Sequence, residues 1–441
     1  MTRQAPMKYT WTNWSKLQRA TPAKVETPWT STQLQRAVRE AIAQGSRMKA
    51  IGAGHSFTGI AVADDIQLDL SRYTGMVALD PVRRQVTLRA GTRLWQIPQL
   101  LADTGLALQN LGDINRQSIA GAISTSTHGT GLTFGGLASQ VVGCELITGT
   151  GEVLTVSQDH HPELLDALRV TLGAFGILTT VTLQLVPAYD MHTVERHAEL
   201  DWVLEHWDDL NTDHDHFEFF WFGHDREVIT KASTRLPVSH TRPTRMARLR
   251  ERAVDEVVMN MTLAGICQLG RVKPGWVPHL NRLATLGWGS STRRAHWSTA
   301  FTSDRRVRFN EMEYALPFAA IPEVLAELRQ LYRRGEISST YPMEVRSAAA
   351  DTAWLATNHG RRTGYIAVHQ HFSQDHRQYF ARIEPIFRAA GGRPHWGKLH
   401  SLTAQELATL YPCWDHALAL RDELDPNRVF ANAYLTRVFG T

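Results

Sequence analysis

The stretch Ile51-Gly52-Ala53-Gly54-His55-Ser56-Phe57 decides how the rest of the chain is interpreted. It directly follows the short apolar run Met48–Ile51, which has the composition of a strand. Glycines in such a loop let the backbone turn sharply and bring its N–H groups close to a ligand, most often a phosphate. A histidine has little packing reason to be there. Taken alone, the string is equally consistent with an ordinary turn after a strand, in which His55 only bonds to its neighbours.

The overall composition is that of a globular protein with two or three domains. The chain has 441 residues, of which 43% are hydrophobic and 20% are charged. The formal net charge is +4, and no long basic run occurs. This balance favours anionic small molecules as ligands and argues against nucleic acid as a partner.

Cysteine usage and hydropathy indicate the compartment. The three cysteines, Cys144, Cys267 and Cys413, are far apart and have no metal-ligand spacing, which fits a reducing environment. The first residues contain no apolar core of a signal peptide, and no apolar run approaches the roughly 18 residues of a membrane span. We therefore expect a cytoplasmic protein without a transmembrane segment.

The first part of the chain has the pattern of a mixed α/β unit. Thr30 or Ser31 is expected to cap a helix that Gly45 ends. Strands are expected over Met48–Ile51, Ile66–Leu70 and Gln85–Ala90, and a further helix over Leu94–Ala102. This order puts the opening loop at the end of a strand, a usual place for a ligand.

A second loop is predicted over Ser118–Gly131, with the sequence SIAGAISTSTHGTG. Small residues, hydroxyls and glycines dominate it, so a flexible linker is one interpretation. Ile119, Ile123 and His128 argue against low complexity, and a packed loop around an anionic cofactor fits better.

The composition of the chain and the spacing of its expected elements change near residue 188, which suggests a domain boundary. A hairpin over Val141–Thr148 and Glu152–Val156, a helix over Pro162–Val170 and a strand over Leu178–Val186 precede it. Beyond it, strands are expected over residues 217–222, 308–316, 341–346 and 365–371, with a helix over residues 321–333. Residues 235–300 are basic and rich in arginine and proline, with helical pieces, and suggest no role.

Taken together, these segments resemble flavoproteins of the vanillyl-alcohol-oxidase (VAO) type. The resemblance runs from Trp14 to Phe439 and is closest to the sugar-1,4-lactone oxidase/dehydrogenase group, in particular its actinobacterial L-gulono-1,4-lactone dehydrogenases, with the alditol oxidases as neighbours. It implies an α+β protein with a two-domain fold. An FAD-binding PCMH-type domain would span residues 15–187, a substrate (cap) domain of sheet plus helices residues 188–404, and a segment returning to the FAD domain residues 405–441.

The resemblance also assigns the cofactor site. GAGHSF matches the flavin diphosphate loop, SIAGAISTSTHGTG a second loop that embraces the flavin, and LGAFGIL a turn at the adenine end. His55 falls where many members bond a histidine covalently to the flavin 8α-methyl group. The cofactor-binding residues implied are Gly52, Ala53, Gly54, His55, Ser56, Ser118, Gly121, Ala122, Thr125, His128, Gly129, Gly176 and Ile177.

Three C-terminal strings make the match specific. PMEVR (342–346) resembles the family's Glu-x-Arg active-site strand, RPHWGK (393–398) its His-Trp-Gly-Lys segment, and DPNRVF (425–430) with Asn432 and Tyr434 its terminal signature. We expect the terminal signature to brace the cofactor side. Ser347 departs from the pattern, because relatives commonly carry an aromatic residue after the arginine, and this puts the shape of the substrate pocket in doubt.

The catalytic residues implied are Glu344, Arg346 and Lys398. Spacing of i, i+2 on a strand puts Glu344 and Arg346 on one face. There they can hold vicinal hydroxyls, and Arg346 offers paired donors to lactone oxygens. An ordinary ion pair worth about 0–1 kcal/mol is the alternative. By resemblance, Lys398 lies near the reacting hydroxyl, where burial and Arg346 would favour its neutral form, so that it accepts a proton. Alternatively, Lys398 only extends over Trp396. His395 is expected to support the site rather than to react.

The implied reaction is hydride transfer from a carbinol carbon to flavin N5. L-gulono-1,4-lactone is the expected substrate, with D-arabinono-1,4-lactone or an alditol next, and oxygen, a quinone or a cytochrome as electron acceptor. Two other classes stay open. A metal-dependent hydrolase is suggested by His214 with His216, His369 with His371, and His395 with His400. A flavin-binding protein that has lost its activity is the second, and the presence of Glu344, Arg346 and Lys398 argues against it.

Overall fold

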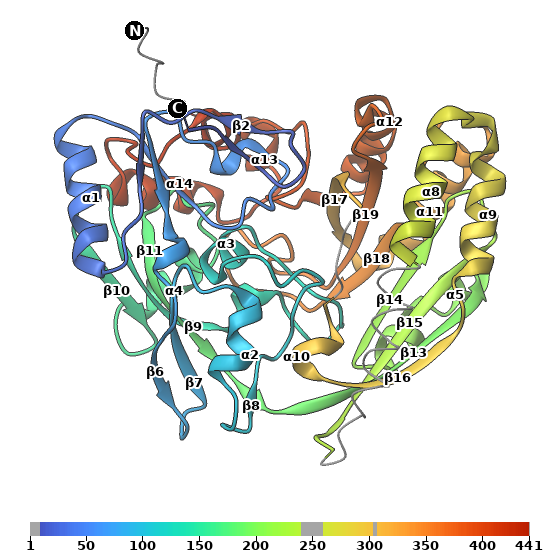
Figure 1. Cartoon of the computed structure of the whole chain (residues 1–441), viewed down its shortest axis with the longest axis horizontal. Helices are drawn as coiled ribbons and strands as arrows, with labels where there is room; N and C mark the ends of the chain where they lie inside the picture. Colours follow the sequence, from blue (N-terminus) through green and yellow to red (C-terminus); the bar gives the residue numbers. More distant parts are fainter. Residues whose placement is uncertain (1–8, 240–258, 303–306, 441) are drawn as a thin grey trace, which may run out of the picture.

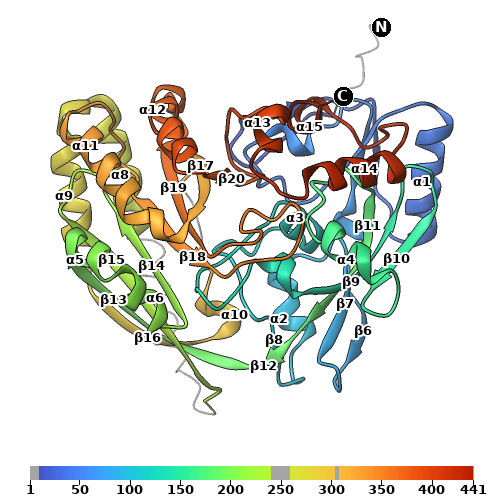
Figure 2. The same ribbon diagram turned by 180° about the vertical axis from the view of Figure 1, so that it is seen from behind.

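The computed structural model describes residues 9–239, 259–302 and 307–440, and places two β-rich halves side by side (Figures 1 and 2). In the first half, a parallel sheet has the order β3 (Lys24–Glu26), β5 (Ile66–Asp69), β4 (Met48–Ile51). Helix α1 (Ser31–Ala43) precedes β4. The Thr30 hydroxyl accepts the Gln33 N–H at 3.2 Å and caps this helix, as predicted.

A five-stranded antiparallel sheet completes the first half. Its order is β10 (Val153–Ser157), β9 (Val141–Ile147), β11 (Ile177–Gln184), β7 (Gln85–Arg89), β6 (Met76–Asp80). The predicted β9–β10 hairpin is confirmed, with helix α4 (Pro162–Leu168) after it. Among the other short elements are β1 (Trp11–Thr12), β2 (Arg19–Ala20), α2 (Ile97–Leu100), β8 (Leu106–Ala107) and β12 (Val186–Pro187).

The prediction of a loop over 118–131 was wrong for its first part. Residues Ile119–Ser124 form the short helix α3, and the Ser118 hydroxyl caps it by accepting the Gly121 N–H at 3.2 Å. Ile119 and Ile123 lie one turn apart and are fully buried. That contact outweighs the low helix propensity of glycine and serine.

The second half contains an eight-stranded sheet. Its order is β16 (Ser291–His296), β13 (Tyr189–Glu199), β15 (Glu227–Pro237), β14 (His216–Trp221), β18 (Met343–Ala348), β19 (Thr363–His371), β17 (Phe309–Pro317), β20 (Arg393–Pro394). Helices α11 (Ile321–Arg333), as predicted, and α12 (His376–Ala389) contact each other and this sheet. Helices α5 (Leu200–Glu205), α6 (Trp207–Thr212), α8 (Met259–Val272), α9 (Val277–Gly287) and α10 (Trp297–Ala300) belong to this half as well (Figures 1 and 2).

The C-terminal residues lie against the first half of the chain. Helices α13 (Ala404–Ala408), α14 (Trp414–Leu424) and α15 (Ala433–Phe439) are drawn in red beside the blue N-terminal elements (Figure 1). The Asn432 amide donates to the backbone oxygens of Gly59, Ile60 and Val62 at 3.0, 3.2 and 2.9 Å. None of the helices in the described ranges has the length and hydropathy of a membrane span.

Candidate active site

The first cleft of the site lies between the opening loop and α3. It has a volume of about 810 Å³ and is lined by Gly52 to Ser56, Ser118, Gly121, Thr125 and the turn at 171–178, which includes Gly176 and Ile177. A Cβ on Gly52 would lie 2.5 Å from Ser118 Oγ, so with Ser118 in place glycine lets the opening loop approach the start of α3. Backbone N–H groups at the start of a helix and in a glycine turn suit a diphosphate. The cleft therefore fits the cofactor that the motifs imply.

Lys49 joins three segments at the back of this cleft. Its ammonium group donates to the backbone oxygens of Gly173 at 2.9 Å, Phe430 at 3.3 Å and Leu172 at 3.4 Å. The terminal segment thus braces the same cleft: the Gly149 N–H donates to Leu424 O, and the Met48 N–H to Val429 O, both at 2.7 Å.

His55 stands where the first cleft opens into a second one. Its ring stacks on Trp14 with centroids 5.9 Å apart. Burial, followed by the positive charges of Lys398, Arg93 and Arg116, lowers the pKa of His55 to about 4. The imidazole is therefore neutral near pH 7, and one ring nitrogen carries a lone pair that is available for bond formation.

The second cleft, of about 740 Å³, shares His55, Ser56, Gln117 and Thr125 with the first. Side chains from β17, β18, β19 and the segment after β20 converge on it. The ionisable ones among them are Glu311, Glu313, Glu344, Arg346, His369, His395 and Lys398, and the first half of the chain adds His55, Asp113 and His128. All three predicted catalytic residues thus lie in one cavity, continuous with the one that fits a flavin.

Arg346 is held by three carboxylates. Its Nε–H donates to Glu218 Oε2 at 2.9 Å, and its Nη2 group donates to Asp113 and Glu344. Burial opposes the charge, but these carboxylates keep the pKa of Arg346 well above its ordinary value. Lys231 pairs with Glu218 at 2.5 Å from the far side, outside the second cleft. The guanidinium group is therefore permanently charged and fixed in orientation.

Lys398 pairs with Glu311 and lies over the ring of Phe57, 5.2 Å from its centroid. It does not extend over Trp396, whose fully buried indole donates to Leu355 O at 2.7 Å. Burial alone would raise the pKa of Glu311, but Lys398 and His369 lower it to about 2. Glu311 is thus the anionic partner of Lys398, and His369 Nε2 lies 3.5 Å from its other oxygen.

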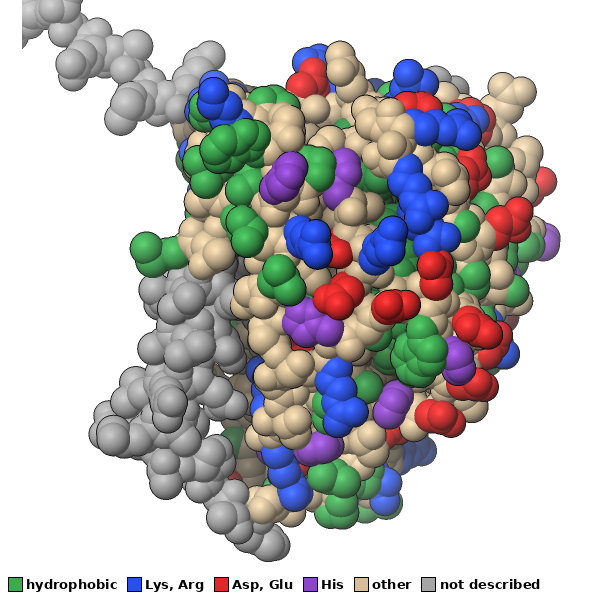
Figure 3. Space-filling view, turned by 90° about the vertical axis from the view of Figure 1, so that its right-hand side faces the viewer, with side chains coloured by type: hydrophobic (Ala, Val, Ile, Leu, Met, Phe, Trp, Pro, Cys, Tyr) green, Lys and Arg blue, Asp and Glu red, His purple; other side chains and the backbone are tan. Residues whose placement is uncertain are grey.

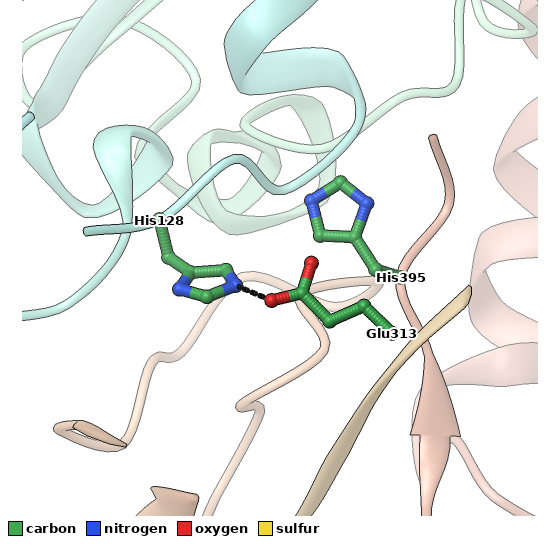
Figure 4. A group of neighbouring side chains, drawn as sticks. All are labelled: His128, Glu313 and His395. Atoms are coloured by element: carbon green, nitrogen blue, oxygen red, sulfur yellow. Dashed lines mark hydrogen bonds and ion pairs between the residues drawn. The ribbon is translucent and has the colours of Figure 1, made fainter. Parts of the chain in front are cut away.

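His128, Glu313 and His395 form a buried group beside these residues (Figure 4). His128 Nε2 lies 3.1 Å from Glu313 Oε1 and its Nδ1 lies 2.8 Å from Gly129 O, so both ring nitrogens face acceptors. The ring also stacks on Tyr365, with centroids 3.5 Å apart. His395 Nδ1 accepts the Gly397 N–H at 3.0 Å, and burial lowers the pKa of His395 to about 3. Two histidines and a carboxylate within 4.8 Å are also a possible metal-ligand set.

Of the six histidines that suggested a hydrolase, His395 alone belongs to this group, as far as the described residues go. His216 accepts from Arg235 Nε at 3.1 Å, and His400 Nε2 lies 3.1 Å from the Tyr434 hydroxyl. Of the six histidines, only His369 and His395 line the second cleft, which is formed by described residues.

Two of the expected cofactor residues lie outside both clefts. Ala122 is buried in the core below the first cleft, and Gly129 lines a smaller cavity with Thr130 and His216. Ser347 lies on the opposite face of β18 from Arg346, where its backbone N–H donates to the Thr130 hydroxyl at 3.3 Å. Its small side chain therefore does not shape the cavity, and the doubt that it raised is removed.

Sequence reasoning missed the acidic residues of the site. Glu311 and Glu313 were assigned only to an apolar strand, although their i, i+2 spacing is the one that drew attention to Glu344 and Arg346. Asp113 and Glu218 belong to no motif, and His369 was noted only as half of a histidine pair. The strand order β14–β18–β19 brings Glu218 and His369 to Arg346 and Glu344.

The architecture and the cleft define the class: an FAD-dependent oxidoreductase with the two-domain VAO fold. Cholesterol oxidase from Brevibacterium sterolicum has a TM-score of 0.76 at 17% identity, covering 98% of this chain and 96% of that one. A solvent-stable cholesterol oxidase has a TM-score of 0.79, also at 17% identity, covering 98% and 97%. At this identity the likeness concerns the fold alone. A family model described as FAD binding domain matches residues 22–157.

The chain belongs to the D-arabinono-1,4-lactone oxidase family, whose model matches residues 181–438. It is 39% identical to an L-gulono-1,4-lactone dehydrogenase of Mycobacterium tuberculosis over 430 residues, which cover 98% of this chain and 99% of that protein. It is 30% identical to the L-gulonolactone oxidase of Bos taurus, with 97% of both chains covered.

Proposed function

We propose that this protein oxidises a sugar 1,4-lactone at a carbinol carbon, with L-gulono-1,4-lactone as the first candidate substrate. The observation that carries the proposal is the convergence of Glu344, Arg346 and Lys398 in a cavity continuous with the FAD cleft. The names of the most similar relatives support the substrate class. FAD supplies the hydride acceptor when it is bound.

The residues of the chain orient the substrate and stabilise charge. Arg346 is the fixed cation for the lactone oxygens, and Glu344 accepts a hydrogen bond from a neighbouring hydroxyl. Lys398 faces the oxygen on which negative charge develops, and Glu311 stands behind it as the carboxylate that balances its charge. The hydroxyl proton passes to Lys398 as the Lys398 ammonium group gives one of its own protons to the Glu311 carboxylate, so that the lysine stays charged and the carboxylate is neutralised.

The test is anaerobic reduction of the purified holoenzyme. We expect L-gulono-1,4-lactone to bleach the visible flavin band, with D-arabinono-1,4-lactone and alditols reacting more slowly. If an alditol bleached the flavin band faster than the lactones, the protein would be an alditol oxidase instead. Failure with all lactones and alditols would favour a flavin-binding protein without activity.

We also propose that His55 is bonded covalently to the flavin. The neutral imidazole at the junction of the two clefts supports this assignment. After acid precipitation the yellow colour should stay in the pellet, and in His55→Ala it should move to the supernatant. Colour that appears only in the supernatant of the wild-type protein would refute the bond.

For the electron acceptor, oxygen, a quinone and a cytochrome are the candidates. Mixing the reduced enzyme with each of them in a stopped-flow instrument ranks them by the rate at which the flavin is reoxidised. The acceptor with the highest second-order rate constant is the one to assign.

A further inference from the structure

The lining of the first cleft supplies little positive charge to a cofactor that carries a diphosphate. Among the described residues that line it, only Lys49 and His55 are ionisable. The Lys49 ammonium group already donates to three backbone oxygens, and the imidazole of His55 is neutral near pH 7. Backbone N–H groups can orient a diphosphate, but a cation is the partner that compensates its charge.

Arg93 is the next cation beside this cleft. It is paired with Ser118, the residue that caps α3, in an isolated antiparallel bridge, and the Leu94 N–H donates to Gln117 O at 2.9 Å and fixes this pairing. Opposite residues of an antiparallel pair direct their side chains to the same side, with Cβ atoms about 4.5–5.5 Å apart. The Ser118 hydroxyl faces Gly52 of the opening loop. The Arg93 side chain therefore starts on the side of the cleft.

The guanidinium group of Arg93 is incompletely compensated within the protein. Its Nη1 is buried and has no hydrogen-bond partner among the residues that the structure describes. Burial lowers the pKa of Arg93, and the carboxylate of Asp69, which opposes this shift, already accepts the Ser71 N–H at 2.8 Å. By contrast, several exposed lysine and arginine side chains lie beside acidic ones on the face drawn in Figure 3. A buried charged donor is costly to leave without an acceptor, and a ligand oxygen would satisfy it.

Two neighbours place this guanidinium group at the opening loop. Asp69, whose charge acts on Arg93, is the β-sheet partner of Ile51, the residue directly before Gly52. At the other end of the loop, the charge of Arg93 contributes to the lowered pKa of His55. The group thus lies beside the glycine turn that the motifs assign to the diphosphate.

We propose that Arg93 is the cation that binds the diphosphate of FAD. Arginine suits this role because its planar fork of donors matches the oxygens of a phosphate. Lys49 is a poorer candidate, since its N–H groups are already bound by backbone oxygens. The assignment depends on FAD as the cofactor and not on the identity of the substrate.

The test measures reversible binding of FAD to the full-length apoprotein. His55→Ala is the parent, because it cannot form a covalent bond with the flavin through that residue. In Arg93→Gln made in this parent, we expect the Kd of FAD to rise about 10- to 100-fold, as for the loss of a charge-assisted hydrogen bond. The Kd of riboflavin, which has no phosphate, should stay the same. Arg93→Lys should recover part of the affinity for FAD, because it restores the charge without the planar fork.

Arg89→Gln is the matched control. Arg89 lies on β7, shortly before Arg93, and its guanidinium group lies over the ring of Tyr73, 5.5 Å from the centroid. This variant should bind FAD like the parent. The melting temperature of each apoprotein verifies folding, and Arg93→Met, which keeps most of the length of the side chain, replaces Arg93→Gln if the latter does not fold.

Inorganic pyrophosphate provides a second measurement. It should compete with FAD for the parent, and its inhibition constant should rise in Arg93→Gln. The proposal is overturned if this constant is unchanged, or if Arg93→Gln binds FAD as tightly as Arg89→Gln. It is also overturned if the Kd of riboflavin rises by the same factor as that of FAD, because Arg93 would then act on the flavin ring or on the fold. None of these outcomes decides whether a lactone is oxidised, which the anaerobic reduction of the wild type tests separately.

Discussion

Arg346 donates its Nε–H to the buried carboxylate of Glu218 at 2.9 Å, across the junction of β18 and β14. Glu218 in turn pairs with Lys231 on β15. The orientation of the guanidinium group towards a substrate therefore depends on residues that do not line the substrate cavity themselves.

Glu218→Gln tests this dependence. The amide keeps the shape but loses the charge, which leaves Lys231 and Arg346 less well compensated, and a charge-assisted hydrogen bond is worth about 1.5–3 kcal/mol. We expect kcat/KM to fall about 10- to 100-fold, mainly through KM, in steady-state kinetics. The control is Glu227→Gln. Glu227 is the partly exposed partner of His197, and its substitution should change kcat/KM little. An unchanged kcat/KM in Glu218→Gln would contradict the positioning role.

Lys398→Met should lower kcat about 100-fold or more, as expected for the loss of a group that stabilises developing charge. Lys398→Arg should recover part of the loss because it restores the cation beside Glu311. The measurement is the rate of anaerobic flavin reduction in single turnover. If Lys398→Met raised KM alone and left this rate unchanged, Lys398 would bind the substrate without acting on the reaction.

Gly52→Ala should impair flavin binding, because the new Cβ would lie 2.5 Å from Ser118 Oγ. Removing that oxygen relieves the contact, because the next nearest atom, the Ser118 Cβ, lies 3.6 Å from the new Cβ at position 52. The double variant Gly52→Ala/Ser118→Ala should therefore retain more flavin than Gly52→Ala. The ratio of flavin absorbance to protein absorbance measures how much flavin each variant retains. Ser118→Ala alone is the reference, because it also removes the cap of α3, and the loss of a helix cap costs about 1 kcal/mol. A double variant no better than Gly52→Ala would show that the contact is not the cause.

Covalent attachment should have an unusual pH dependence. Bond formation needs the neutral imidazole, and the pKa of His55 is lowered to about 4, so protonation competes only below that value. Apoprotein mixed with FAD should build up acid-stable flavin at a constant rate over roughly pH 5 to 8 and more slowly at lower pH. A decline centred on the ordinary histidine value of about 6.5 would contradict the buried environment of His55.

Local patterns predicted most of the elements, but they could not predict how the strands are ordered. Helix α1 with its Thr30 cap, the β9–β10 hairpin and α11 follow from periodicity and end signals within a dozen residues. The order of the eight-stranded sheet, in which β14 lies beside β18, depends on contacts between residues more than 100 positions apart. No local signal encodes that order.

The same limit determines which residues of the site could be predicted from the sequence. Glu344, Arg346 and Lys398 were found because they stand in short recognisable strings, and all three line the cavity. Glu313 pairs with His128, 185 positions away, so its role is visible only after folding. Acidic residues in an otherwise apolar strand are costly to bury without partners, and this cost is the signal by which Glu311 and Glu313 could have been found.

The backbone ties the segment after α3 to β18. The Gly131 N–H donates to Ser347 O at 2.9 Å, and the Thr130 hydroxyl accepts from the Ser347 N–H. A mutation that shifts β18 therefore also shifts the segment after α3. New substrate preferences should accordingly evolve by substitutions of side chains that leave the backbone of β18 in place, with this strand kept as the common frame of the reaction.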